Sequence, residues 1–242
     1  TDAEITAVMR SAVYFKTGVA FERSGWFSAI ENAERMAVVD LRQGLPLRAM
    51  EEHSHGHDGH DGHVHTLACA DAHGLDPHVW LSPPLLGKQA ETIADALIDL
   101  RPEVREAVTA SLADLQARLD AVDGEIRAKL DGLESQEFFV FHPAWGYFAD
   151  EYGLKQVAIE IGGKEPSDAE LTNVLHRARE AGIRVIFVQP QITGKSARTV
   201  AEIIGGRVEV IDPLARDVAE NLRRVADALN AAAKEAGATK SS

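Results

Sequence analysis

Histidine is the residue type whose number and spacing in this chain could support chemistry. Residues 53–78 hold eight of the ten histidines, and between residues 53 and 65 the only apolar residue is Val64. Such a stretch cannot bury enough surface to offset its ordering entropy, so we expect a mobile loop. Neutral imidazole is a good ligand for zinc, copper and nickel, and this loop therefore predicts several overlapping metal sites of low specificity. The six histidines of the loop are His53, His55, His57, His60, His63 and His65.

Two other interpretations of this segment are an expression tag and a merely solvated polar loop. Spacing by Gly and Asp inside the chain, rather than six consecutive histidines at one end, argues against a tag. The single cysteine, Cys69, either assists a metal there or is a small buried hydrophobe.

His78 lies in a different setting, the sequence DPHVWLSP at residues 76–83. Proline on both sides and the apolar Val-Trp-Leu run favour a fixed backbone that could aim one imidazole. Taken alone, a histidine beside a tryptophan is more often a satisfied core or surface residue than a ligand.

Two further polar residues follow short apolar runs directly. His142 comes after FFVF and precedes Pro143, while Asp212 comes after VEVI and precedes Pro213. The carboxyl ends of parallel strands are where α/β proteins bind ligands. An imidazole among aromatic residues is costly unless its nitrogens are satisfied, whereas Asp212 alone could equally be a turn cap before proline.

The periodicity of the chain predicts the elements that carry these residues. Apolar positions recur at steps of three or four over residues 103–130, which predicts one amphipathic helix about 40 Å long. After residue 137, apolar runs alternate with helical stretches, which predicts a parallel sheet covered by helices. The expected helices are 2–12, 20–33, 84–100, 195–204 and one after Pro166 that opens with the capping box Ser167-Asp168-Ala169-Glu170, and the expected strands are 13–15, 36–41, 138–141, 157–161, 185–188 and 208–211.

Composition excludes several classes of function. The net charge of −13 repels nucleic acid and anionic lipid, and no basic patch with interleaved aromatics occurs. No apolar run approaches the roughly 20 residues that span a bilayer. One cysteine permits no internal disulfide.

Three motifs together are specific: DPHVWLSP, FHPAWGYFADEYG and VIDPLA, in this order around a His-rich insertion. They resemble the zinc-binding solute receptors of bacterial ABC importers, over essentially the whole chain from residue 2. The resemblance implies an α/β fold of two lobes, each a mainly parallel sheet flanked by helices, joined by a long rigid linking helix with the metal in the cleft between them. The implied parts are an N-terminal lobe at 1–100 with the His-rich loop at 50–75, the linking helix at 101–132 and a C-terminal lobe at 133–242.

The resemblance also implies a ligand set: His78 from the first lobe, with His142 and Asp212 from the second. Manganese-specific relatives tend to have Glu where this chain has His142, so the imidazole favours zinc. A further ligand is expected in a His-x-Tyr-x-Pro segment upstream of Thr1, together with the first strand of that lobe. Without it, water, a loop histidine or Glu160 would complete the coordination.

The function that follows from the resemblance is capture of Zn(II) outside the cytoplasmic membrane and delivery to an ABC permease. We expect a monomer, periplasmic or anchored outside that membrane, with the His-rich loop as an accessory site and His176 as an ordinary surface histidine. The alternatives are a manganese or iron receptor of the same family, a metal-buffering protein that acts through the loop alone, and a zinc hydrolase. The hydrolase is disfavoured because the sequence has no HExxH, and residues 55–60 match HxHxDH poorly.

Overall fold

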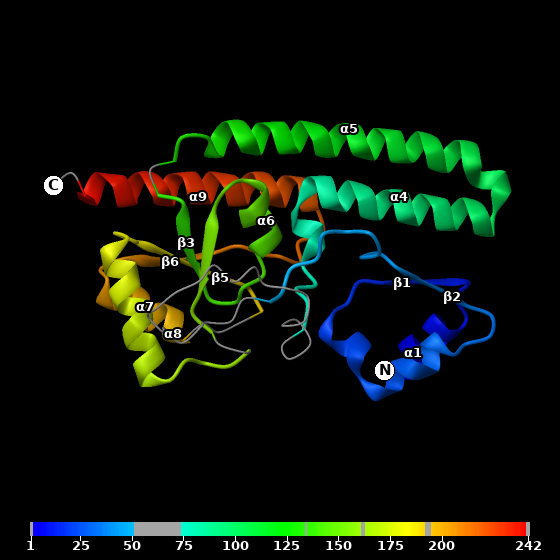
Figure 1. Cartoon of the computed structure of the whole chain (residues 1–242), viewed down its shortest axis with the longest axis horizontal. Helices are drawn as coiled ribbons and strands as arrows, with labels where there is room; N and C mark the ends of the chain where they lie inside the picture. Colours follow the sequence, from blue (N-terminus) through cyan, green and yellow to red (C-terminus); the bar gives the residue numbers. More distant parts are fainter. Residues whose placement is uncertain (1, 51–73, 134, 161–162, 192–194, 241–242) are drawn as a thin grey trace, which may run out of the picture.

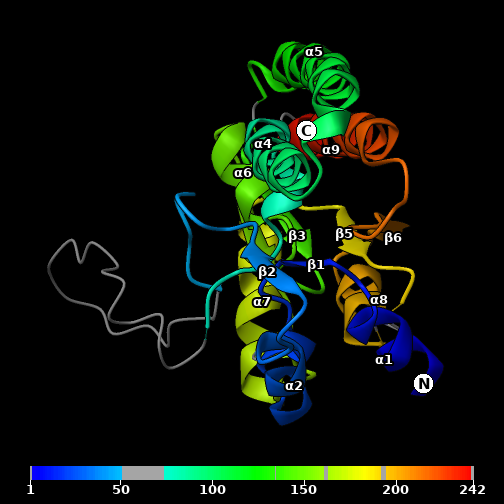
Figure 2. The ribbon, with the colours of Figure 1, turned by 90° about the vertical axis from the view of Figure 1, so that its right-hand side faces the viewer.

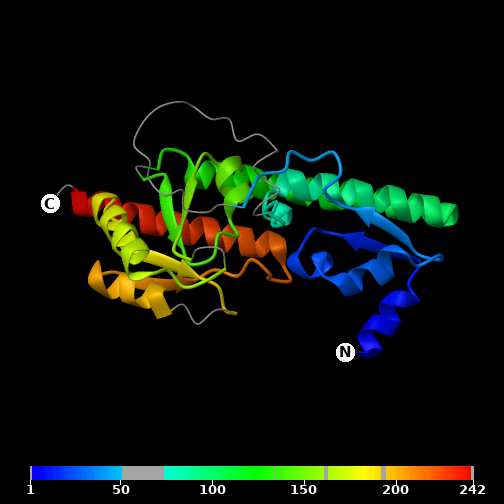
Figure 3. The same ribbon diagram turned by 60° about the horizontal axis from the view of Figure 1, so that its bottom comes forward.

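The protein has two lobes beneath a layer of long helices (Figure 1). The computed structural model describes residues 2–50, 74–133, 135–160, 163–191 and 195–240. The predicted His-rich loop and Cys69 lie outside these ranges. Figure 3 shows the lobes side by side along the helices, with the two termini on different lobes. The predicted two-lobed α/β fold is confirmed.

The C-terminal lobe is built on a four-stranded parallel sheet of strand order β4-β3-β5-β6. Alternate strand residues face two separate cores, which explains why the central strands β3 and β5 read as nearly continuous apolar runs. Phe138 and Val140 face the core shared with α5, α6 and α9, whereas Phe139 faces the core under α7 and α8. The bounds are β3 Glu137–Val140, α6 Gly146–Glu151, β4 Lys155–Ala158, α7 Asp168–Glu180, β5 Val185–Val188, α8 Lys195–Ile203, β6 Arg207–Val210 and α9 Val218–Lys240.

The N-terminal lobe has a parallel pair of strands, β1 (Val13–Lys16) and β2 (Ala37–Asp40), after helix α1 (Asp2–Met9). The predicted helix over 20–33 is wrong. The structure has 3-10 turns at Ala20–Arg23 and Gly25–Phe27 and the short helix α2 (Ser28–Glu31). Ser24 is the physical reason, because its backbone is extended (φ −79°, ψ 149°) and both its N–H and its hydroxyl bond back to the carbonyl of Phe21.

Three long helices form the upper layer. Helix α4 (Pro83–Leu100) leads through a 3-10 turn (Pro102–Val104) into α5 (Arg105–Leu130). Figure 2 looks along them and shows α4 and α9 both beneath α5. At 1.5 Å per residue the 26 residues of α5 extend about 39 Å, so α5 passes over both lobes as predicted. Within the described ranges, every helix is too short or too polar to span a bilayer.

The segment that carries His78 packs mainly on the C-terminal lobe. The 3-10 helix η4 (Val79–Leu81) follows His78, and Leu81 lies in the apolar core beneath α5, α6 and α9. Two residues that follow His78 in the sequence are thus fixed by burial, since Val79 is 0% and Leu81 1% exposed. This burial gives the imidazole a rigid base.

Strand β4, which pairs with β3 in the sheet, ends earlier than predicted. Strand β4 covers 155–158, whereas 157–161 was predicted. The N–H of Ile159 donates to the carbonyls of both Val140 (2.9 Å) and Phe141 (3.3 Å), and the N–H of Glu160 also donates to that of Phe141 (3.0 Å). Regular ladder pairing stops there. Glu160 therefore lies beyond the end of β4, beside His142.

Candidate metal centre

The imidazole of His78 is held by a buried carboxylate. Oδ1 of Asp76, a residue that is 0% exposed, accepts the backbone N–H of His78 at 3.0 Å and lies 2.7 Å from its Nδ1. An ionised carboxylate only accepts hydrogen bonds, so Nδ1 carries the proton. Nε2 is then the ring nitrogen left to bind a metal, the arrangement that metal-binding histidines adopt.

His142 shows the same arrangement on the other side. His142 follows Phe141, the first residue after β3. The N–H of Phe141 donates to the carbonyl of Phe187 at 2.8 Å and so continues the sheet pairing beyond β3. Nδ1 of His142 pairs with Oε1 of Glu160, a carboxylate that is only 6% exposed. The side chain of His142 is 23% exposed, so one edge of the ring is accessible to a solute.

The two imidazoles meet although one precedes α4 and the other follows β3. Their ring centroids are 5.5 Å apart and the planes are at 76°. Trp80 lies against the same group, with its ring centroid 5.3 Å from that of His78. Two imidazoles with oriented ring nitrogens, an aromatic wall and two flanking carboxylates are suited to a borderline transition metal such as zinc.

Asp212 follows β6 and Ile211, at the same edge of the sheet as His142. Its Oδ1 accepts hydrogen bonds from the Gln191 side chain (3.2 Å) and from the Leu214 backbone (3.0 Å). Its carbonyl accepts a hydrogen bond from Asn221 at 2.6 Å. Asp212 is thus firmly placed, but these contacts are not contacts with the histidines.

The structure brings His78 and His142 together but does not assemble a complete coordination shell. Among the residues that it describes, no group of three or more His, Cys, Asp and Glu side chains is arranged to hold a metal ion. The six histidines of the predicted accessory site lie outside the described ranges. His176 is on α7 with its side chain 72% exposed and Nδ1 3.1 Å from Glu180, so the prediction of a surface histidine is confirmed.

Tyr147 supports the backbone that leads into the site. Burial raises the pKa of Tyr147, and the charge of Asp76 raises it further, against the lowering effect of the hydrogen bond and charge of Arg48. The hydroxyl therefore stays protonated and donates to the carbonyl of Asp76 at 3.1 Å. This bond ties α6 to the residue that orients His78.

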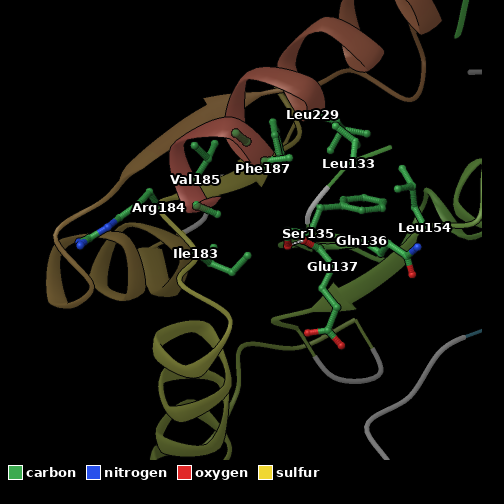
Figure 4. A pocket seen from close by; sticks show the side chains of 14 residues that line it. Leu133, Ser135, Gln136, Glu137, Leu154, Ile183, Arg184, Val185, Phe187 and Leu229 are labelled. Atoms are coloured by element: carbon green, nitrogen blue, oxygen red, sulfur yellow. Dashed lines mark hydrogen bonds between the residues drawn. The ribbon is translucent and has the colours of Figure 1, made fainter. Parts of the chain in front are cut away.

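The pocket in Figure 4 is not part of this centre. It is a cavity of about 20 Å³ between α9 and the sheet, with mainly apolar walls such as Phe138, Leu154 and Leu229. That volume holds about one water molecule. It is a packing defect of the C-terminal lobe rather than a ligand site.

Asp76 and Glu160, which orient the two imidazoles, were not predicted from the sequence in that role. Asp76 was visible as part of the DPH motif, whereas Glu160 lay inside the predicted strand 157–161 and was expected at most to complete the metal coordination. Neither residue has a signal of its own that separates an orienting carboxylate from a cap. Their roles emerge only from the contacts.

A two-lobed α/β protein with two carboxylate-oriented histidines facing each other is the class that the fold and the site define. The family model ZnuA, described as "Zinc-uptake complex component A periplasmic", matches residues 1–232, and the chain belongs to this family.

Relatives and solved structures agree with this assignment. "High-affinity zinc uptake system protein ZnuA" of Bacillus subtilis (strain 168) is 36% identical over 145 residues, 59% of this chain and 46% of that protein. "Zinc-binding protein AdcA" of Streptococcus pyogenes serotype M3 is 30% identical over 197 residues, 78% of this chain and 38% of AdcA. The matched region thus spans less than half of either relative. A crystal structure of ZnuA superposes with a TM-score of 0.83 at 33% identity, covering 96% of this chain and 84% of that one.

Proposed function

We propose that this chain is part of an extracytoplasmic, high-affinity zinc receptor that captures Zn(II) and delivers it to the permease of an ABC importer. The observation that carries the proposal is the facing pair His78 and His142, each with Nδ1 engaged by a buried carboxylate. Relatives named for zinc uptake and zinc binding support the same function. Zn(II) is the cargo in this proposal and not a resident cofactor.

The proposed ligands are His78, His142 and Asp212. The two histidines would bind through Nε2, because Nδ1 of each is occupied. Asp212 is the proposed carboxylate ligand because the residue after it, Pro213, accepts a hydrogen bond from Trp80, two residues after His78. The proposed accessory site in the His-rich loop comprises His53, His55, His57, His60, His63 and His65.

Zinc is preferred over manganese or iron in this proposal. Two imidazoles suit zinc, whereas manganese favours a larger share of oxygen ligands. The competing proposal, a manganese or iron receptor of the same family, would require the carboxylates Asp76 and Glu160 to leave the histidines and bind the metal. Both carboxylates are buried and bonded to an imidazole, which argues against that rearrangement.

A zinc hydrolase is a weaker proposal, again because Asp76 and Glu160 are bonded to the two histidines. Hydrolysis needs an open metal position with an activated water and an acid or base beside it. The carboxylates nearest the histidines, Asp76 and Glu160, are committed to orienting them. Turnover of an ester or peptide by the zinc-loaded protein would favour the enzyme.

The proposed setting is outside the cytoplasmic membrane, with the protein either periplasmic or anchored. The family description includes the word periplasmic, and one relative in Streptococcus pneumoniae is named a zinc-binding lipoprotein. The net charge of −13 suits a cation receptor and not a nucleic-acid-binding protein. We propose that the receptor acts as a monomer.

Metal analysis tests the proposal. The protein purified without added metal should contain zinc, and a competition titration should place zinc well above manganese in affinity. A preference for manganese or iron would support the competing receptor. Absence of tight binding of any of these metals would contradict both.

A further inference from the structure

Arg48 lies between the two histidine-bearing segments and touches both. Its backbone carbonyl accepts the N–H of Asp76 at 3.0 Å, and its backbone N–H donates to the hydroxyl of Tyr147 at 3.1 Å. Its guanidinium lies 3.2 Å from Asp150 on α6 and 3.9 Å from Oδ2 of Asp76. A single residue from the N-terminal lobe thus connects the carboxylate behind His78 to the helix that follows His142.

The charge balance around Asp76 depends on this guanidinium. The side chain of Asp76 is 1% exposed, and its Oδ2 accepts no hydrogen bond within the described residues. Its Oδ1 is occupied by His78. The guanidinium of Arg48 faces this second oxygen at 3.9 Å, and the Arg48 side chain is itself only 20% exposed.

Gly146 makes room for this contact. A Cβ atom at this position would overlap the guanidinium of Arg48 and would lie 3.0 Å from Oδ2 of Asp76. Gly146, the first residue of α6, therefore leaves the space that the guanidinium of Arg48 occupies. The next residue, Tyr147, completes the connection, because its hydroxyl bonds to both Arg48 and Asp76 and its ring lies 6.0 Å from the guanidinium.

We propose that Arg48 is a positioning residue of the zinc site, which fixes the imidazole of His78 through Asp76 and sets its place relative to His142 through α6. The inference rests on the proposed function, since it concerns the geometry of the same two histidines. Arg48 does not touch the metal. It acts by holding the Asp76 carboxylate in place behind Nδ1 of His78 and by holding α6 against the segment at residues 74–76.

Two substitutions disturb the contact in different ways. Arg48→Met removes the guanidinium and keeps most of the side-chain volume, whereas Gly146→Ala displaces the guanidinium without removing any charged group. Loss of a group that orients a metal-bound histidine typically lowers metal affinity by about 10- to 100-fold. We expect both variants to fall in that range for Zn(II), and Arg48→Lys to recover part of the loss because it restores the charge without the planar fork.

The control is Arg223→Met, which removes a comparable guanidinium from the ion pair with Glu125 between α9 and α5. It should bind zinc as the wild type does. The readouts are zinc affinity by competition, the visible spectrum of the Co(II)-loaded protein, and the ¹⁵N signals of the His78 ring, with the melting temperature measured in parallel. A general loss of stability would lower the melting temperature without changing the tautomer signal of His78.

Unchanged zinc affinity, Co(II) spectrum and ring signals in both Arg48→Met and Gly146→Ala would overturn the proposal. If Arg48→Met fails to fold, Gly146→Ala and Arg48→Lys decide the matter. Failure of the proposed function would look different, because the wild type itself would then bind no zinc tightly.

Discussion

The indole nitrogen of Trp80 donates a 2.9 Å hydrogen bond to the carbonyl of Pro213, 133 positions further along the chain. Trp80 lies two residues after His78, and Pro213 directly follows Asp212. The loops of two proposed ligands are therefore tied together by a bond that involves neither ligand side chain.

Trp80→Phe tests whether this tie matters. The substitution keeps an aromatic ring near His78 and removes the N–H, leaving the Pro213 carbonyl without this donor. We expect the free energy of unfolding to fall by about 1 kcal/mol and zinc affinity to fall by several-fold, as measured by urea unfolding and by chelator competition. Tyr152→Phe is the control. It removes a hydroxyl that donates to Asp123 of α5 from the C-terminal end of α6, the end away from His142. If Trp80→Phe binds zinc as tightly as the wild type, the metal site does not depend on the hydrogen bond from Trp80 to Pro213.

The His-rich loop is predicted to be an accessory site. Its histidines alternate with Gly and Asp, which gives many weak ligand sets and no fixed geometry. Deletion of residues 53–65 should lower the number of zinc ions bound and leave the tightest site intact. Calorimetric titration of the deleted and intact proteins measures both quantities. Disappearance of the tightest site on deletion, with His142 still present, would show that the loop holds the cargo.

Movement between the lobes is predicted to be small on metal binding. Helix α5 passes over both lobes, and a continuous helix resists bending more than two or three extended strands do. Small-angle scattering or crystallography of metal-free and zinc-bound protein should show nearly the same shape. A rotation of tens of degrees between the lobes would contradict this prediction.

The N-terminal lobe carries an ion pair that makes its stability depend on pH. Asp40, the last residue of β2, accepts three hydrogen bonds from Arg42, at 3.0, 2.9 and 2.7 Å. Burial alone would raise the pKa of Asp40, but the bonds and charge of Arg42 outweigh it and hold the pKa below its usual value. The stability that the pair contributes is therefore present above the unfolded pKa of about 4 and is lost as the pH falls through the lower folded value.

Asp40→Asn should consequently be less stable than the wild type at about pH 6, with the difference shrinking below about pH 4. Urea unfolding at a series of pH values measures this difference. A constant difference across the series would mean that the carboxylate contributes through packing and not through its charge.

Sequence patterns predicted the elements whose residues repeat with a clear period. The stripe from Val104 to Leu130 defined α5, and the apolar runs before His142 and Asp212 defined β3 and β6. Local chemistry was also readable at Ser167 and Glu170, which form the predicted capping box at the start of α7. These features depend on neighbours within one turn or one strand.

Features that depend on distant neighbours were not predicted. The break at Ser24 is a local exception, because the serine bonds back to Phe21, three residues earlier, where periodicity favoured a helix. Arg48 had no motif at all, since its partners Asp76, Tyr147 and Asp150 are brought to it only by the fold. Asp212 as a ligand stays a prediction, because its observed contacts are to Gln191 and Leu214.

The proposed zinc site is tested most directly by zinc titration of two separate variants, His142→Ala and, as the control, His176→Ala. His142 faces His78 with its Nδ1 bonded to Glu160, whereas His176 is an exposed histidine on α7. The removal of one imidazole ligand should weaken the tightest site at least tenfold, about 1.4 kcal/mol, while His176→Ala should bind as the wild type does. Equal zinc affinity in the two variants would contradict the assignment of the metal to the His78 and His142 pair.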